Sequence, residues 1–377
     1  MEGWRERQGA RAETDSMKWR SGPWRPVVAT KGERMPSQEA IMEHIAIDLG
    51  GRESQVCVRG ADGAILQEHR CPTRGLAKYL EGRPASRVIV ETCSESFAVA
   101  DAAAALGHEV RVVPAALVRS LGVGSRRTKT DLRDARILSE VSCRIDLPSV
   151  HIPATESRQR KTMCGMREAL VGARTKMINT VRGWLRGQGI ECRSGVPRFV
   201  ERVRQAVGGE LPSYVERQLK VIDELARQIT EADQELAKLA KSDSTCRRLM
   251  TVPGVGPVTA VRFVAAIDGI DRFTDAHKVE AYLGLTPGEH SSSERQRRTS
   301  ITKAGPAAVR WALVQAAWGA RRTKASHPMV AWSLEVEKRR GKKVAIIALA
   351  RKIAGILFAL WRDGTFYDAR HQAPTAA

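Results

Sequence analysis

Residues 128–138 read TKTDLRDARIL and carry the pattern on which the fold prediction depends. Thr130 is a favourable N-cap and the apolar residues after it have helical spacing, so a helix is predicted to begin here. Asp131 and Asp134 then project from one face of its first turn. Such a pair is explained either by the positive end of the helix dipole or by a divalent cation held between the carboxylates.

Two further acids end apolar stretches upstream. Asp48 closes the apolar part of HIAIDLGG (44–51), and Glu91 closes that of RVIVETCS (87–94). Each acid is therefore predicted at the end of a strand. Acids at strand ends and at a helix start can converge at one edge of a sheet, where four carboxylates could hold two Mg²⁺ ions about 4 Å apart.

The order of the predicted elements indicates a fold class. A hairpin and a third strand are expected within 44–71, with Asp62-Gly63 at the tight turn. A helix (about 73–82), the strand RVIVET, a helix (about 95–106) and the strand EVRVVP follow. Three strands in a meander, then alternating helices and strands, is the order of an α/β ribonuclease H-like fold.

Length and charge limit the classes of function. A chain of 377 residues with 42% hydrophobic composition can form two or three domains, and its net charge of +20 indicates a polyanionic partner. Nucleic acid is the leading candidate, with an anionic membrane surface as the alternative. No apolar run reaches the roughly 18 residues of a spanning helix. Residues 344–360 are interrupted by Arg351 and Lys352, so they are predicted to be a core helix.

Cysteine usage and the chain ends give further expectations. The seven cysteines are scattered and never in C-x-x-C spacing, which argues against disulfides and zinc and for a reducing compartment. Residues 1–42 are predicted to be a disordered leader, with Met35 or Met42 as a possible true start. Residues 366–377 are predicted to be a frayed tail.

The middle of the chain is predicted to be helical. Residues 154–195 contain nine Lys or Arg against three acids, with an apolar stripe at helical spacing. The basic face is either solvated or lies along a phosphate backbone. A second helix, about 213–241, has an apolar seam long enough for coiled-coil pairing within or between chains.

The C-terminal part contains two suggestive segments. Pro-Gly-Val-Gly-Pro (253–257) between two apolar stretches fits a phosphate-binding helix-hairpin-helix or plain helix packing. Residues 281–318 read AYLGLTPGEHSSSERQRRTSITKAGPAAVRWALVQAAW. Its three serines fit a flexible polar loop, or a nucleophile among five Lys or Arg that hold a phosphate and lower the hydroxyl pKa.

These motifs together resemble a known family. The order Asp48, Glu91, Asp131, Asp134, with the last two in a KTDxxDA context, and the I-T-K-x-G turn at 301–305 are similar to the DEDD insertion-sequence transposases. That group is also described as bridge-RNA-guided serine recombinases. The resemblance covers about 44–365. It implies a RuvC-like catalytic domain (43–153), a helical or coiled-coil region (154–245) and a mainly helical C-terminal transposase domain (246–365).

The resemblance also implies a mechanism and partners. The four acids would hold Mg²⁺, two ions in number, and Ser292 would attack a phosphodiester of double-stranded DNA at the element ends and target. Ser293 stands where the family has glycine, which leaves Ser291 open as the nucleophile. The family is known for sites shared between subunits of a dimer or tetramer, and for a noncoding bridge RNA that pairs with donor and target DNA. The expected location is the bacterial cytoplasm, at the nucleoid.

Three alternatives stand beside this interpretation. The segment HIAIDLGG resembles the phosphate loop of sugar kinases and actin-like ATPases, but their second Asp loop and adenosine motif are not found. A RuvC-like junction endonuclease would use the carboxylates and water alone. A DNA-binding protein would perform no chemistry. A serine trapped covalently on DNA distinguishes the transposase from all three.

Overall fold

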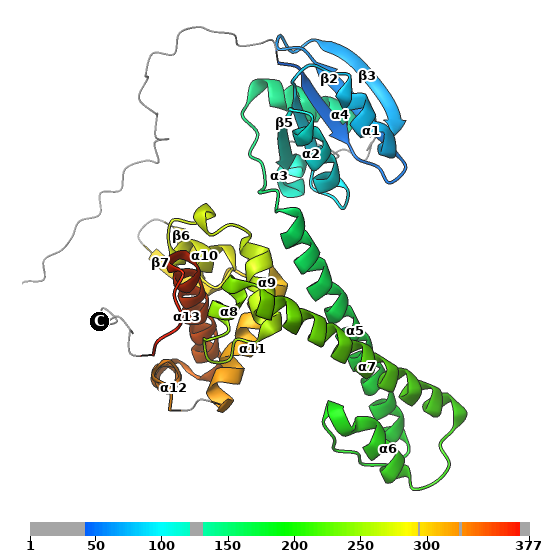
Figure 1. Cartoon of the computed structure of the whole chain (residues 1–377), viewed down its shortest axis with the longest axis vertical. Helices are drawn as coiled ribbons and strands as arrows, with labels where there is room; N and C mark the ends of the chain where they lie inside the picture. The colour runs from blue at the N-terminus through cyan, green and yellow to red at the C-terminus, as the bar shows by residue number, and fades with distance from the viewer. Residues whose placement is uncertain (1–41, 121–130, 293–294, 324–325, 370–377) are drawn as a thin grey trace, which may run out of the picture. The chain divides into compact units, whose positions relative to one another are not determined.

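The computed structural model describes residues 42–120, 131–292, 295–323 and 326–369. The chain divides into two compact units, Met1–Ile152 and Pro153–Ala377 (Figure 1). The predicted N-cap Thr130, nearly all of the predicted leader and the end of the predicted tail lie outside the described residues.

The first unit is built on a mixed five-stranded sheet in the order β3-β2-β1-β4-β5. Strands β1 and β2, and β2 and β3, pair antiparallel, whereas β1 and β4, and β4 and β5, pair parallel. This confirms the predicted α/β class, and the strand order is consistent with a ribonuclease H-like fold. The strands are β1 (His44–Asp48), β2 (Glu53–Arg59), β3 (Ile65–Pro72), β4 (Arg87–Glu91) and β5 (Glu109–Val113).

Alternation along the strands assigns their side chains to two faces. Ile45 and Ile47 of β1 pack on one face with residues of α1 (Leu76–Glu81) and α2 (Ser96–Ala105). Ala46 packs on the opposite face with Leu138 of α4 (Asp131–Arg144). Helix α4 starts at Asp131, where the sequence predicted a helix start. A short helix that the sequence analysis did not anticipate, α3 (Ala115–Ser120), follows β5.

The second unit is mainly helical, with one two-stranded sheet. Its elements are α5 (Thr155–Gly187), α6 (Phe199–Val207), α7 (Ser213–Ser242), α8 (Ser244–Leu249), α9 (Pro257–Ile267), α10 (Ala276–Tyr282), β6 (Pro287–Ser292), β7 (Arg295–Ile301), α11 (Ala307–Thr323), α12 (Pro328–Arg340) and α13 (Lys342–Asp363).

The apolar seam of α7 is buried within the chain. Helices α5 and α7 pack along each other (Figure 1). Leu219, Ile222, Ile229 and Leu236 are each at most 4% exposed. Of the two possibilities that the sequence left open, pairing within the chain therefore accounts for this seam, because the same side chains cannot also face a second subunit.

Helix α13 is a core helix, as predicted. Among the described residues it alone is long and apolar enough to cross a membrane, but half of its apolar window is buried inside the protein. Leu349, Ile353 and Leu357 are fully buried in the core of the second unit. The seven cysteines, all within the described residues, are free thiols. Burial raises the pKa of Cys246 to about 12, so this thiol stays protonated.

Candidate active site

Two predicted site residues lie at the carboxyl ends of adjacent parallel strands. Asp48 ends β1 and Glu91 ends β4. Ile47 pairs with Val90, so the two acids occupy the next positions on neighbouring strands. Ala46, two residues before Asp48, faces α4, and alternate residues of a strand share a face. The strand register therefore directs both carboxylates toward the face that α4 covers.

Polar contacts fix the direction of α4 on this face. The Nδ1 atom of His44, at the start of β1, shares a 2.8 Å hydrogen bond with Ser142 Oγ. One turn earlier in α4, Ser139 Oγ donates to Cys57 Sγ (3.2 Å), and Cys57 pairs with Ala46 in the middle of β1. Helix α4 therefore runs antiparallel to β1, with its start toward the carboxyl end of that strand.

This direction brings Asp134 level with Asp48. Asp134 precedes Ser142 by eight residues, a rise of about 12 Å along the helix. Asp48 follows His44 by four residues, about 13 Å along the strand. Asp134 and Asp48 therefore lie at a similar level along the axis of β1, near its carboxyl end.

Asp134 is only 4% exposed, which is unusual for a carboxylate. Burying a charged carboxylate is costly unless it is paired or binds a metal. The site residues offer carboxylate oxygens, the ligand type that Mg²⁺ prefers. Among the side chains that the structure describes, no group of three or more His, Cys, Asp or Glu is arranged to hold a metal ion. The side chain of Asp131 lies outside that set.

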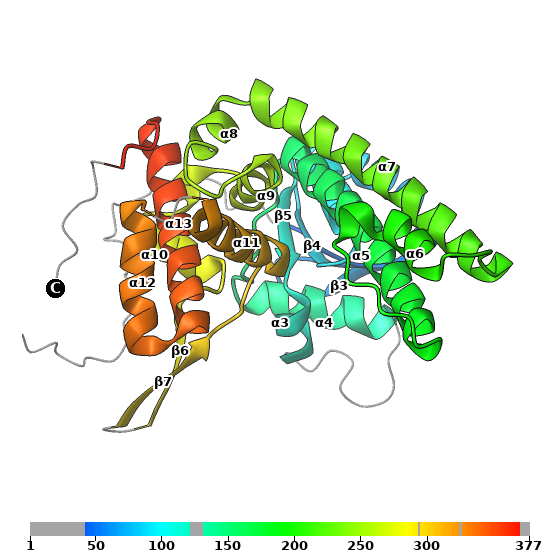
Figure 2. The same ribbon diagram turned by 90° about the horizontal axis from the view of Figure 1, so that it is seen from below.

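The predicted serine loop is instead the end of a β-hairpin. Ser291 pairs with Gln296 and Ser292 with Arg295 in the antiparallel β6–β7 ladder. Figure 2 shows this hairpin extending away from the helices of its unit. No hairpin was predicted here, because the sequence between Ser292 and Arg295 contains no Asn-Gly or Asp-Gly pair. Ser293 and the serine side chains lie outside the described residues.

The basic face of α5 contains two kinds of residue. Arg160 pairs with Asp243 (2.7 Å), and Arg167 pairs with Asp233 (2.7 Å), so these cations tie α5 to its neighbours. Lys161, Lys176 and Arg186 are exposed and remain available to a phosphate backbone.

The glycine of the Pro-Gly-Val-Gly-Pro turn serves helix packing. Gly254 has φ +85°, and a Cβ there would lie 2.1 Å from the carbonyl oxygen of Ala316 in α11. The turn therefore packs backbone to backbone against α11. Of the two interpretations of this turn, close packing accounts for Gly254.

Comparison with known proteins decides the family. A family model for DEDD transposases of the IS110 group matches residues 45–189, and a model described as "Transposase IS116/IS110/IS902 family" matches residues 246–329. "Putative transposase y4pF/y4sB" of Sinorhizobium fredii is 31% identical over 353 residues, which cover 90% of this chain and 89% of that protein.

The chain belongs to the family of DEDD-type insertion-sequence transposases. "Transposase for insertion sequence element IS1328" of Yersinia enterocolitica is 28% identical and covers 86% of this chain and 98% of its own. "Transposase for insertion sequence element IS1111A" of Coxiella burnetii is 29% identical, over 62% of this chain and 67% of that protein. Family membership makes this chain a DNA-binding enzyme that cuts and joins DNA, which sets the sugar-kinase and non-catalytic alternatives aside.

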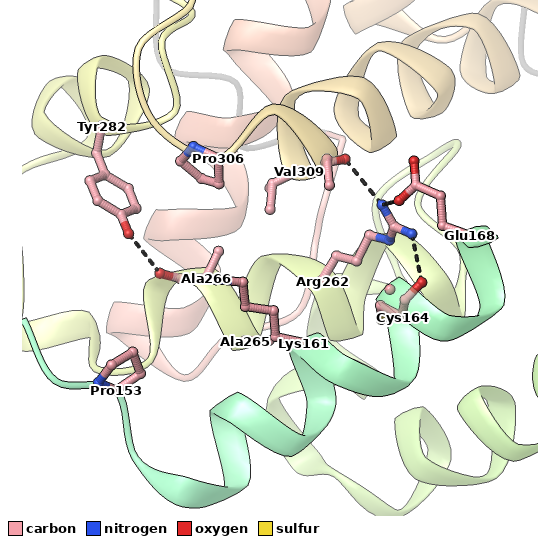
Figure 3. A pocket seen from close by; sticks show the side chains of 12 residues that line it. Pro153, Lys161, Cys164, Glu168, Arg262, Ala265, Ala266, Tyr282, Pro306 and Val309 are labelled. Atoms are coloured by element: carbon pink, nitrogen blue, oxygen red, sulfur yellow. Dashed lines mark hydrogen bonds and ion pairs between the residues drawn. The ribbon is translucent and has the colours of Figure 1, made fainter. Parts of the chain in front are cut away.

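Arg262, which was not among the predicted site residues, is buried in α9 of the transposase. Its side chain is 4% exposed, pairs with Glu168 (2.7 Å), and donates through Nη2 to the Cys164 carbonyl (2.9 Å). These contacts join α9 to α5 beside a cavity of about 230 Å³ (Figure 3). The signal in the sequence was a single arginine within the apolar stretch TAVRFVAAI.

Proposed function

We propose that this transposase cuts and rejoins DNA through a phosphoserine intermediate, with four carboxylates of its first unit holding divalent metal. The observation that carries the metal part is the convergence of β1, β4 and α4. Asp48 and Glu91 end neighbouring strands, and the buried Asp134 lies in the first turn of the helix that covers them. Asp131 begins that helix.

The carboxylates would act by holding cations at the sheet edge. Four acids near one another repel, and this repulsion is offset when a hard cation binds between their oxygens. When bound, two Mg²⁺ ions would stabilise charge on the attacking and leaving oxygens of phosphoryl transfer. We also infer that this unit is a RuvC-like catalytic domain.

The serine would perform a transesterification. Ser292 Oγ forms a bond to phosphorus, the bond from phosphorus to the leaving strand oxygen breaks, and the serine proton passes to that oxygen. An incoming strand hydroxyl then attacks the phosphoserine, which restores the serine hydroxyl and a phosphodiester. Support comes from the family resemblance and from the cations between residues 295 and 303, which favour a phosphate beside the serines. Ser291 is the alternative nucleophile.

The partners follow from the same resemblance. We infer that a noncoding bridge RNA pairs with donor and target DNA, and that the chain acts as a homo-oligomer, a dimer or a tetramer, at the nucleoid of a bacterial cytoplasm. The charge of +20 supports binding to nucleic acid backbones. RNA that copurifies with the protein and contains complements of the element ends would support the guide; purified protein that recombines DNA without RNA would contradict it.

The central experiment follows covalent attachment of labelled DNA to the protein on denaturing gels with Mg²⁺ present. Asp131→Asn and Asp134→Asn are expected to lower adduct formation at least about 100-fold, because charge stabilisation of the reacting oxygens is lost. Ser292→Ala should abolish the adduct. Circular dichroism should remain that of the wild type.

Asp101→Asn is the matched carboxylate control, because Asp101 lies on α2, across the sheet from α4, and is exposed. It should keep wild-type adduct formation. An adduct that survives both Ser292→Ala and Ser291→Ala would overturn the serine chemistry. Metal-dependent cleavage without any adduct would identify a junction-type endonuclease.

A further inference from the structure

The β6–β7 hairpin leaves the helices through two short legs, residues 283–286 and 302–305. The Thr302 N–H donates to the Thr286 carbonyl (2.9 Å), and the Lys303 N–H donates to the Gly284 carbonyl (3.1 Å). These bonds extend the antiparallel pairing of the hairpin to the residues that precede Pro287, where β6 begins. The two legs therefore form one paired base for the strands that carry the serines.

Glycines allow the legs to approach backbone to backbone. Gly284 has φ +67°, and a Cβ on it would lie 2.2 Å from the Ala304 carbonyl oxygen. Gly305 has φ +71°, and a Cβ on it would lie 1.9 Å from the Tyr282 carbonyl oxygen. Real Cβ atoms cannot approach so closely, so glycine is required at 284, where the first leg faces the second, and at 305, where the second leg faces the end of α10.

One arginine joins both legs to α11. Arg310 lies in the first turn of α11, and its Nη1 donates to the Leu283 carbonyl and to the Ala304 carbonyl, each at 2.9 Å. Leu283 belongs to the leg before β6 and Ala304 to the leg after β7. The guanidinium thus bridges the two legs and holds them against a helix whose Leu313 is buried in the core.

Because the hairpin is long, a small rotation at its base produces a larger displacement at its far end. From Pro287 to Ser292 the strand advances five residues, about 17 Å. A tilt of about 10° at the base would move the far end by about 3 Å over that length. Misplacement of a reacting group by 1 Å can lower the rate on the order of 100-fold. Small changes at the base are therefore amplified at the serines.

We propose that Arg310 is a positioning residue for the transposase reaction: it fixes the direction in which the β6–β7 hairpin leaves α11, and so the position of the nucleophilic serine. This inference rests on the proposed serine chemistry. Arg310 acts through the backbone of the two legs and has no direct role in the bond changes.

The test separates chemistry from DNA binding and from folding. The rate of adduct formation is measured in single turnover at saturating DNA, with the DNA Kd and the Tm measured on the same preparations. Arg310→Ala should lower the adduct rate at least about tenfold, while the Kd stays within about twofold of wild type. Arg310→Lys keeps a donor that can reach the carbonyls and should recover part of the rate.

Arg321→Ala is the matched control, because Arg321 is an arginine of the same helix that ties α11 to Glu337 of α12 instead of to the hairpin. Its side chain is 12% exposed, so its loss should lower the Tm. The adduct rate of the folded protein should stay near that of wild type.

Three outcomes would overturn the inference. These are a wild-type adduct rate in Arg310→Ala, an equal loss of rate in Arg321→Ala, or a fall in DNA affinity that accounts for the whole loss. If Arg310→Ala does not fold, Arg310→Lys decides: a reduced adduct rate at an unchanged Kd supports positioning, and a wild-type rate overturns it. Failure of the serine chemistry is distinguished by Ser292→Ala and Ser291→Ala, which would then both retain the adduct.

Discussion

Lys303 has a backbone conformation that lysine rarely adopts. Its φ is +57°, in the left-handed region, and it lies in the second leg of the hairpin base, residues 302–305. A side chain with a Cβ costs roughly 1–2 kcal/mol in this region. Such a conformation persists where the surrounding contacts impose it. Here the Lys303 N–H bond to Gly284 and the Arg310 contact with Ala304 do so.

Lys303→Gly is therefore expected to stabilise the protein. Relief of the left-handed strain should exceed the added freedom of the unfolded chain, for a net gain of about 0.5–1 kcal/mol in the free energy of unfolding. Urea denaturation measures it. Lys303→Ala is the control, because it removes the charge and keeps the Cβ, and should give no such gain. Destabilisation by glycine would show that the lysine side chain supports the fold.

At the scale of elements, Asp243 joins three helices. It is the N-cap of α8, directly after α7, and its Oδ1 accepts the Cys246 N–H at 2.8 Å. Its Oδ2 pairs with Arg160 of α5 at 2.7 Å. Burial by itself would raise the pKa of Asp243, but the hydrogen bonds from Cys246 and Arg160 outweigh burial and lower it. The charged carboxylate thus stabilises this junction.

Asp243→Asn should remove a pH-dependent part of the stability. Because the folded pKa lies below the unfolded value of about 3.9, the contribution is fully present above that pH and is lost as the pH falls through the folded pKa. Asn keeps the cap but loses the ion pair, so the free energy of unfolding should fall by about 1–3 kcal/mol at pH 7.

Denaturation at pH 7 and near pH 3 measures this difference, which should shrink at the lower pH. Asp233→Asn is the control, since Asp233 pairs with Arg167 but is 41% exposed, where ion pairs contribute less. An equal difference between wild type and Asp243→Asn at both pH values would contradict the assignment.

The whole molecule has a charge of +20, yet many of its cations are used internally. On α5, Arg167 is paired with Asp233, whereas Lys176 is exposed. Only cations that face solvent can displace counterions from a nucleic acid backbone. The net charge therefore overstates the number of phosphate contacts, and the exposed residues identify the candidates.

DNA binding is expected to weaken steeply with salt, by about 10³-fold or more between 50 and 200 mM if six or more phosphates are contacted. Lys176→Gln should reduce the slope of log K against log salt by about one, and Arg167→Gln should leave the slope unchanged. Fluorescence anisotropy over a salt series measures both. A flat dependence in the wild type would remove the argument from charge.

Local sequence patterns alone predicted most strands and helices of the first unit. An apolar stretch ends at Asp48 and another at Glu91, which predicts both acids at strand ends. Helical spacing begins at Asp131, which predicts a helix start there. The two charges Arg351 and Lys352 within the apolar residues 344–360 identified α13 as a core helix. These features are determined by the sequence because each depends on residues within a few positions of one another.

Tertiary structure decided the rest. Arg310 and Leu283 are 27 residues apart, and neither has a pattern that indicates their contact. The serine hairpin forms although the sequence has no strong local turn signal there. Its base depends on Gly284, which packs on the Ala304 carbonyl, and on Gly305, which packs on the Tyr282 carbonyl. Likewise, the composition of 154–195 assigns Arg160 and Arg167 to a basic face, whereas the folded chain pairs them with Asp243 and Asp233. The physical reason is that periodicity encodes which face is apolar, whereas the approach of distant backbones is set only when the chain packs.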